Sequence, residues 1–279
     1  MKLDLRPVVR APIAWALAAL EPLRRRRCAY ELAICAIFRD EADFLDEWLR
    51  FHLGVGVEHV YLYNNFSTDH FRAVLAPWIE KGVVTLTDWP VAVGQLPAYR
   101  DCLRRFRREA CWIAFIDIDE FLFAPGAQDI RPILREYRGW PGLAVWQRFF
   151  GSGGHVERPL TPVSLSYFQC AADTVTTVKT IANPRMVYKI GVHVPKFWAG
   201  EARDSSGRSI APGLAPVFDR LRINHYWSRS LADLRDKIAR GDASTADRRD
   251  PDWHYAFERT LNAEHDESIR PAAEAVFGV

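Results

Sequence analysis

The sequence of 279 residues predicts an α/β protein: one domain with a mostly parallel central sheet and helices on both faces. Two observations predict it. From Glu31 to Trp146, short apolar runs alternate with stretches of helical period, which is the pattern of successive strand–helix units. The apolar runs are also continuous, as in strands buried on both faces of a parallel sheet. Apolar residues make up 49% of the chain, enough to build a core and to exclude a disordered protein.

The expected elements of this part alternate in order along the chain. Strands are predicted at 33–38, 59–63, 83–87 and 111–117, and helices at 43–53, 69–81 and 97–110. Gly54 suits the C-terminal cap of the first helix, and Pro77 is expected to kink or split the second. After Trp146 the pattern becomes irregular and rich in Pro and Gly. A further helix is predicted at 230–240, where Ser230 and Asp233 form a capping-box start and Gly241 the end.

The N-terminal residues 1–30 are predicted to form a separate helical and basic segment. Its apolar stretch, residues 11–20, is too short to cross a bilayer, and the basic run at 24–27 follows it, the reverse of the order in a signal peptide. A helix packed on the domain and a peripheral contact with an anionic membrane surface through residues 11–27 are both compatible with this pattern. We expect a cytoplasmic protein.

Charge and cysteine content exclude two further classes. The 37 basic and 35 acidic residues give a net charge of +2, which provides no electrostatic reason to expect a nucleic-acid partner. The five cysteines are an odd number without a Cys-x-x-Cys pair, so we expect reduced thiols and neither a disulfide framework nor a zinc ribbon.

The candidate functional residues follow the predicted strands, because ligands of open parallel sheets bind beyond the carboxyl ends of the strands. The sharpest motif is Asp117-Ile118-Asp119. If the strand stays extended there, both carboxylates point to one side, with Cα atoms roughly 6–7 Å apart. Such a pair suits Mg²⁺ or Mn²⁺ carrying a diphosphate. A solvated acidic turn is the alternative.

Four stretches together resemble glycosyltransferase family 92, also called the DUF23 or glycosyltransferase 2-like group. They are ICAIFRDE (34–41), VYLYNNFSTD (60–69), WIAFIDIDEFL (112–122) and NHYWSRS (224–230). The resemblance covers roughly residues 31–270. It implies a GT-A fold, a nucleoside-diphosphate sugar donor such as a UDP-sugar, a glycan or lipid-linked acceptor, Mn²⁺ or Mg²⁺ on the Asp-x-Asp motif, and an inverting transfer. Within the domain, 31–146 would be the nucleotide-sugar half and 147–279 the acceptor half.

The resemblance also implies roles for individual residues. The donor would contact Phe38, Arg39, Glu41, Asn64, Asn65, Asp69, Gln95, Arg100, Asp117 and Lys179. The metal would be held by Asp117, Asp119 and His225, with His193 as the rival histidine. Asp119 and Glu120 would take part in catalysis, and Glu157 and Asp219 are candidates for the base that deprotonates the acceptor.

Several of these residues have a purely structural role as the alternative: a helix cap for Asp69, a salt bridge for Glu120, a packed histidine for His225 and an exposed lysine for Lys179. Two other functions compete with sugar transfer. A sugar-phosphate nucleotidyltransferase usually has a glycine-rich, basic phosphate loop after its first strand, and FRDEAD is acidic and lacks glycine. A non-catalytic nucleotide-sugar-binding protein is the second alternative.

The ten tryptophans divide by their positions. Trp48, Trp78 and Trp112 fall in patterns that predict core packing. Trp146, Trp198 and Trp227 fall in the irregular second half, where sugar rings would stack on flat apolar faces.

Overall fold

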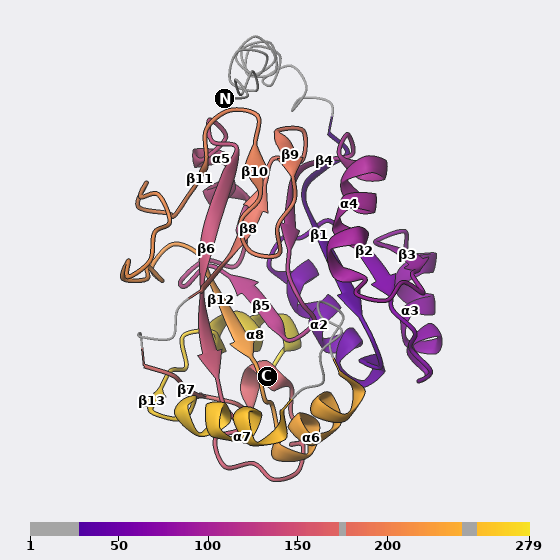
Figure 1. The fold of residues 1–279 in the computed structure, drawn as a ribbon, viewed down its shortest axis with the longest axis vertical. Coiled ribbons are helices and arrows are strands. Elements are labelled where there is room, and N and C mark those ends of the chain that lie inside the picture. Colours follow the sequence, from indigo (N-terminus) through magenta and orange to yellow (C-terminus); the bar gives the residue numbers. More distant parts are fainter. Residues whose placement is uncertain (1–27, 173–176, 242–249) are drawn as a thin grey trace, which may run out of the picture.

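The computed structural model describes residues 28–172, 177–241 and 250–279. The predicted N-terminal segment and its membrane contact fall almost entirely on residues 1–27, outside the described residues. Within the described part, the predicted α/β class with one central sheet is confirmed (Figure 1).

The first half of the domain follows the predicted alternation. Its strands are β1 (Tyr30–Phe38), β2 (His59–Asn64), β3 (Val84–Asp88) and β4 (Ala110–Phe115), and its helices are α2 (Ala42–Gly54), α3 (Phe71–Glu80) and α4 (Gln95–Phe106). The β1 strand pairs in parallel with β2 and β4, and β2 pairs in parallel with β3. The order β4-β1-β2-β3 therefore brings the polar turns after these strands to one edge of the sheet.

Local details differ from the expectations. Strand β4 ends at Phe115, two residues before the expected end, and α4 ends at Phe106. Helix α3 is continuous through Pro77. The C-cap of α2 is Val55, one residue after the expected Gly54, which is the last residue of the helix. A Cβ at Gly54 would lie 2.5 Å from Val276 Cγ2, so the glycine permits close packing of α8.

The second half completes the sheet with both strand directions. Strand β8 runs antiparallel to both β4 and β6, and β12 runs parallel to β6 and antiparallel to β5. Its remaining elements include the predicted helix α6, which has the expected capping box between Ser230 and Asp233. The elements are β5 (Glu120–Phe123), α5 (Arg131–Glu136), β6 (Gly142–Phe150), the 3₁₀ helix η1 (Val163–Leu165), β7 (Gln169–Cys170), β8 (Thr177–Ala182), β9 (Val187–Lys189), β10 (Lys196–Phe197), β11 (Ala202–Arg203), β12 (Arg222–Tyr226), α6 (Leu231–Arg240), α7 (Pro251–Thr260), β13 (Glu264–His265) and α8 (Arg270–Phe277).

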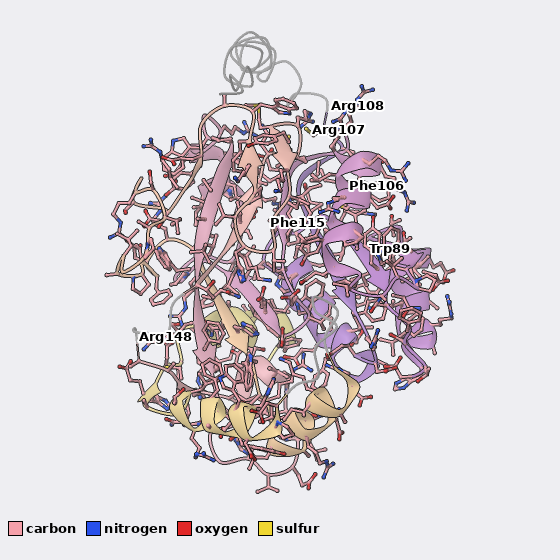
Figure 2. The ribbon with its side chains drawn as sticks, in the orientation of Figure 1. Trp89, Phe106, Arg107, Arg108, Phe115 and Arg148 are labelled. Atoms are coloured by element: carbon pink, nitrogen blue, oxygen red, sulfur yellow. The ribbon has the colours of Figure 1, made fainter. Side chains whose placement is uncertain are left out.

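A hydrophobic core lies on each face of the sheet. Alternate residues of β1 supply each core: Ile34 packs with α2, α3 and α8, and Cys35 packs on the other face with α4. Phe106 of α4 and Phe115 of β4 belong to this second core, while Arg107 and Arg108 beyond α4 are exposed (Figure 2). The expected covering of both faces by helices is confirmed.

The tryptophans follow the prediction only in part. Trp48 and Trp112 are fully buried, as expected, and Trp78 is half-buried. The prediction for Trp146 is wrong: its side chain is 3% exposed in the core on the α4 side, and its Nε1 donates a hydrogen bond to Asp204. Trp146 belongs to β6, whose neighbouring residues face the two cores in turn: Val145 packs in the core on the α2 side and Trp146 in the core on the α4 side.

All five cysteines lie in the described part of the chain, and no disulfide joins any of them there. Among the residues that the structure describes, no helix has both the length and the apolar character that crossing a bilayer requires.

Candidate active site

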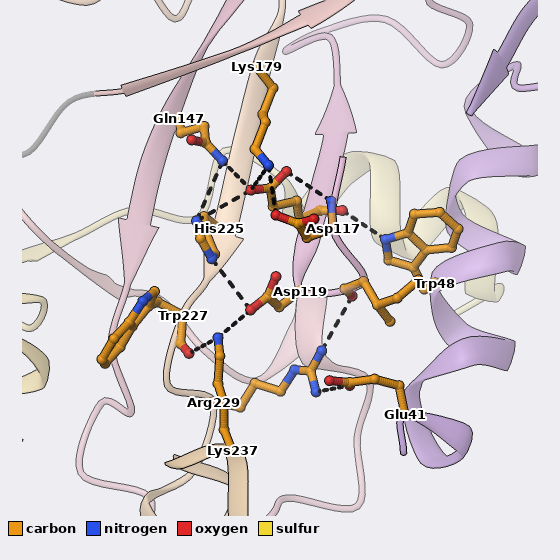
Figure 3. Close-up of polar contacts among 12 residues, drawn as sticks. Glu41, Trp48, Asp117, Asp119, Gln147, Lys179, His225, Trp227, Arg229 and Lys237 are labelled. Carbon is orange, nitrogen blue, oxygen red and sulfur yellow. Dashed lines mark hydrogen bonds and ion pairs between the residues drawn. The ribbon is translucent and has the colours of Figure 1, made fainter. Parts of the chain in front are cut away.

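A cleft of about 560 Å³ opens beyond the carboxyl ends of β1 and β4 and is closed on its other side by β12, α6 and α7. Its polar centre is drawn in Figure 3. Ten polar, charged or aromatic residues that line it are Phe38, Arg39, Glu41, Gln95, Asp117, Asp119, Glu120, Lys179, His225 and Lys237.

The Asp-x-Asp motif lies in a turn. The Glu120 amide donates a hydrogen bond to the Asp117 carbonyl over 3.1 Å, and the Asp117 amide donates to Glu120 Oε2 over 3.1 Å. The chain thus reverses between β4 and β5, so the expected extended strand through the motif is wrong, although both carboxylates line the same cleft. In this turn the two carboxylates contact different partners, and the Glu120 side chain also lines the cleft.

The Asp117 carboxylate is held by uncharged and cationic donors. Lys179 Nζ lies 2.7 Å from its Oδ2, and Gln95 Nε2 lies 2.9 Å from its Oδ1. The side chain of Lys179 is only 2% exposed, so the expected alternative of an exposed lysine is wrong. Burial by itself lowers the pKa of Lys179, but Asp117 and Glu120 outweigh it and raise the pKa, so the lysine is charged.

The Asp119 carboxylate lies lower in the cleft, between two other groups (Figure 3). Lys237 Nζ lies 2.5 Å and His225 Nε2 lies 3.4 Å from its Oδ2. Burial favours a higher pKa for Asp119, but Lys237 and then His225 overcome that effect and hold the pKa well below its ordinary value. Asp119 is therefore an anion across the physiological pH range.

Glu120 is fully buried at the back of the cleft. Its Oε1 accepts a hydrogen bond from Gln147 Nε2 at 2.5 Å and lies 3.4 Å from Lys179 Nζ and 3.6 Å from His225 Nδ1. Burial raises its pKa, and the charge of Lys179 opposes that rise. The salt bridge expected as the structural alternative for Glu120 is present, with Lys179, and both residues line the cleft.

Asp119, Glu120 and His225 form a candidate metal site. One ligand atom from each can be chosen so that all three atoms lie within 4.8 Å of one another. Bonds of about 2.0–2.1 Å place the ligands of Mg²⁺ at most about 4.2 Å apart, so these three side chains would draw closer together to hold a small divalent cation. Two carboxylates and one imidazole also suit Mn²⁺. Asp117 and His193 lie outside this group: His193 lines the cleft, but its Nδ1 contacts the Val178 carbonyl at 3.0 Å.

The cleft floor is fixed by an ion-paired network around Glu41. Arg229 Nη1 donates to Glu41 Oε2 over 2.7 Å, and Arg240 donates to Oε1 of the same carboxylate. Arg229 has a positive φ of 54°, and it lies 3.5 Å over the Phe44 ring. A non-glycine residue held in this region carries backbone strain, which these contacts offset. Glu41 lines the cleft, but both oxygens of its carboxylate are already paired with arginines.

The other donor-site candidates separate into lining and supporting residues. Phe38, Arg39 and Gln95 line the cleft. Asn65 is fully buried and links Arg39 to the loop that follows β3. Its side-chain oxygen accepts a hydrogen bond from Arg39 Nη2, and its side-chain amide donates to the Trp89 and Val91 carbonyls.

Asn64 and Asp69 act within the turns. Asn64 donates to Asp88 and accepts from the Ser67 amide, and Asp69 Oδ2 accepts from the Ala42 amide at the start of α2 over 2.8 Å. The expected helix cap is therefore real, but Asp69 caps a helix from a neighbouring loop. The turns after β1 and β2 thereby brace each other.

Three further candidates lie neither in the cleft nor in the turns that brace it. Arg100 is exposed and lines a separate hollow with Arg104 and Arg107. Glu157 and Asp219, the candidate bases, are exposed and are not among the residues that line the cleft. Glu157 and Asp219 lie in irregular stretches, for which the sequence offered no periodicity to show which way the side chain points, whereas Arg100 lies on the exposed face of α4.

The sequence analysis missed Lys237, Arg229, Gln147 and Trp253, all of which lie at or beside the site. Arg229 belongs to the NHYWSRS stretch and was available from that motif. Lys237 lies on the well-predicted helix α6, but nothing in a helical pattern states that a lysine seven residues after the cap meets an aspartate 118 positions earlier.

Comparison with known proteins identifies the family of the chain. Residues 30–210, well over half of the chain, match the sequence model of Glycosyltransferase family 92. The chain therefore belongs to glycosyltransferase family 92, as its motifs predicted. A GT-A fold is what that membership implies for the α/β domain described above.

Two relatives and one solved structure illustrate the similarity. A glycosyltransferase family 92 protein of Oryza sativa subsp. japonica is 33% identical over 177 residues, 60% of this chain and 30% of that protein. A galactan beta-1,4-galactosyltransferase of Arabidopsis thaliana is 26% identical over 205 residues, 66% of this chain and 40% of that protein. The crystal structure of S. aureus TarS in complex with UDP has a TM-score of 0.37 and 10% identity, and the match covers 56% of this chain and 47% of that one.

The chain spans about a third of the length of the curated relatives that it matches most strongly.

Proposed function

We propose that this chain transfers a sugar from a UDP-sugar to a glycan or lipid-linked acceptor, and that it requires Mn²⁺ or Mg²⁺. The observation that carries the proposal is the group of Asp119, Glu120 and His225, whose ligand atoms lie within 4.8 Å of one another in the cleft. Membership of glycosyltransferase family 92 supports it, and the galactosyltransferase among the relatives makes UDP-galactose the first donor to test.

The metal would offset the negative charge that builds on the departing diphosphate. The residues of this chain would do the rest. Lys179 Nζ contacts Asp117 at 2.7 Å and Glu120 at 3.4 Å. These contacts would hold the Glu120 carboxylate beside His225 before a ligand binds. Arg39 and Gln95 line the part of the cleft nearest β1, where they would contact the nucleotide.

Inversion at the anomeric carbon stays a prediction from the family resemblance, since a base for it remains unassigned. The cytoplasmic location, the membrane contact of residues 11–27 and the division at residue 146 also stay predictions.

Metal titration tests the proposal directly. We expect Mn²⁺ to bind the wild-type protein, followed by electron paramagnetic resonance, and UDP to bind only with Mn²⁺ present. Asp119→Asn and His225→Gln should each weaken Mn²⁺ binding by at least about 10-fold, because each removes or weakens a ligand. Asp219→Asn, an exposed carboxylate outside the cleft, is the matched control and should bind Mn²⁺ normally.

The proposal is wrong if Asp119→Asn keeps both the wild-type Mn²⁺ affinity and the turnover of UDP-galactose. The two alternatives have their own signatures. A nucleotidyltransferase would form a UDP-sugar from UTP and a sugar 1-phosphate, and a non-catalytic binder would retain UDP·Mn²⁺ without consuming the donor.

A further inference from the structure

Five aromatic side chains form a continuous group on the β12 and α7 side of the cleft. We call this group the aromatic shelf: Phe149, Trp227, Trp253, His254 and Phe257. The Trp227 and His254 rings are stacked, with centroids 5.3 Å apart and planes at 20°, and the Trp253 and Phe257 rings are stacked at 5.2 Å and 12°. The shelf is thus a set of flat rings held in fixed orientations by one another.

The shelf adjoins the candidate metal site. Phe149, Trp227, Trp253 and His254 line the same cleft as Asp119 and His225. The centroids of the Phe149 and His225 rings lie 4.7 Å apart, so the aromatic shelf is in direct contact with a candidate metal ligand. Arg39 and Gln95, which come from β1 and α4, line the same cleft from the first half of the domain.

Trp253 is the solvent-exposed member of the aromatic shelf. It lies in the first turn of α7, after the N-cap Asp250 and Pro251, and 54% of its surface is exposed. A large apolar ring exposed in a concave site beside polar ligands is a typical binding element. Trp253 does not belong to the hydrophobic clusters of the described residues, whereas its neighbour Phe257 packs against Phe149 and Trp227.

The chemistry of the shelf points to an uncharged ring as ligand. A diphosphate needs cations or backbone amides, and apart from the titratable His254 the shelf members carry no ionisable group. A pyranose ring carries axial C–H groups on one face, and these pack on the negative face of an aromatic ring. A sugar stacked there would lie next to Asp119 and His225.

We propose that the aromatic shelf is the acceptor subsite, and that it binds a pyranose unit of a glycan chain by stacking on Trp253. This inference rests on the proposed function and names the acceptor of that same site: a saccharide recognised by its ring, with any lipid carrier making no contribution to binding there.

Binding of a soluble oligosaccharide without nucleotide tests the inference. The probe is β-1,4-galactotetraose, titrated by calorimetry into the wild-type protein, Trp253→Ala and Trp253→Phe. We expect Trp253→Ala to weaken binding about 3- to 10-fold, the range of one aromatic stacking contact, and Trp253→Phe to stay within about 2-fold of wild type. Leu160→Ala is the control, since Leu160 is a fully exposed apolar side chain that is not among the residues lining the cleft.

A second measurement separates acceptor from nucleotide. The dissociation constant of UDP·Mn²⁺ should be the same in the wild type and Trp253→Ala, and in transfer assays the acceptor KM should rise while the KM for the donor stays constant. Circular dichroism and the melting temperature of Trp253→Ala confirm that the variant is folded.

Three results would overturn the inference. Trp253→Ala could bind the oligosaccharide as well as the wild type does. It could instead lose UDP·Mn²⁺ affinity, which would assign the ring to the nucleobase. The wild type could also ignore the soluble saccharide and use only a lipid-linked acceptor. If the proposed function alone fails, the wild type shows no Mn²⁺-dependent UDP binding, while oligosaccharide binding still depends on Trp253.

Discussion

At the scale of single residues, Lys237 decides how the candidate metal site is balanced. Its Nζ lies 2.5 Å from Asp119 Oδ2 and 2.8 Å from the Trp227 carbonyl, and its side chain is 16% exposed. The ammonium therefore stands beside the carboxylate that we assign to a divalent cation. Two cations beside one carboxylate repel each other, so metal binding must displace Lys237 or proceed against its charge.

We therefore expect Lys237→Met to bind Mn²⁺ more tightly than the wild type in the absence of nucleotide, by roughly 10-fold, or about 1.4 kcal/mol. The measurement is Mn²⁺ titration followed by electron paramagnetic resonance. Lys189→Met is the control, because Lys189 is an exposed lysine on β9 and lines a different hollow. Unchanged or weaker Mn²⁺ binding in Lys237→Met would show that the ammonium does not compete with the metal.

At the scale of elements, the turns between strands and helices set the positions of the site residues. Gly94, the residue before α4, has no room for a side chain: a Cβ there would lie 2.6 Å from the Val91 carbonyl oxygen and 2.9 Å from Asn65 Nδ2. This contact matters because α4 begins with Gln95, which donates to Asp117. Asn65 in turn holds Arg39.

Gly94→Ala should therefore lower the free energy of unfolding by about 1–3 kcal/mol, the usual cost of overpacking, and should also weaken UDP·Mn²⁺ binding by moving Gln95 and Asn65. Urea denaturation and calorimetry measure the two effects. Gly139→Ala is the matched control, since a Cβ at Gly139 meets nothing within 4 Å and its φ is not positive. A Gly94→Ala protein with the stability of Gly139→Ala would contradict this account.

The turn between β4 and β5 shows where prediction from the sequence stopped at this scale. Cys111 to Asp117 is a continuous apolar run up to the first aspartate, so a strand through Asp117 was the natural prediction. In the structure the strand ends at Phe115, because the chain must reverse to pair Glu120 of β5 with His225 of β12. Hydrophobic periodicity carries no information about a partner strand that lies about a hundred residues later.

At the scale of the whole molecule, one buried charge network joins the two halves of the sheet. Lys179 comes from β8, which pairs with β4 on one side and β6 on the other. Its ammonium reaches Asp117 and Glu120, and its side chain is 2% exposed. Asp117 follows β4 of the parallel half and Glu120 belongs to β5, whereas the cation comes from β8, so the ammonium of Lys179 joins carboxylates from both parts of the sheet.

Removing that cation should be costly. We expect Lys179→Met to lower the free energy of unfolding by about 3–5 kcal/mol, because Glu120 would be left charged and buried without its ammonium. The double variant Lys179→Met/Glu120→Gln should recover part of the loss, since the amide carries no charge. Urea denaturation of the single and double variants, with Lys189→Met as control, gives both values; equal stability of Lys179→Met and Lys189→Met would refute the network's role.

The sequence by itself determined the α/β class, the strand–helix order of the first half, the capped helix α6 and the family. Each of these depends on local patterns: continuous apolar runs, helical period, a capping box and short motifs. It also pointed to Asp119, Glu120 and His225, which the structure brings together.

Only the tertiary structure decided how these groups are paired. Lys237 meets Asp119 across 118 positions, Lys179 meets Asp117 across 62, and Arg229 meets Glu41 across 188. Such pairs arise from the order and direction of strands in the sheet, which periodicity does not encode. The same reason explains why Glu157, Asp219 and Arg100 fell outside the cleft and why Trp146 lies in the core: the sequence placed each near the right element but could not show which way its side chain points.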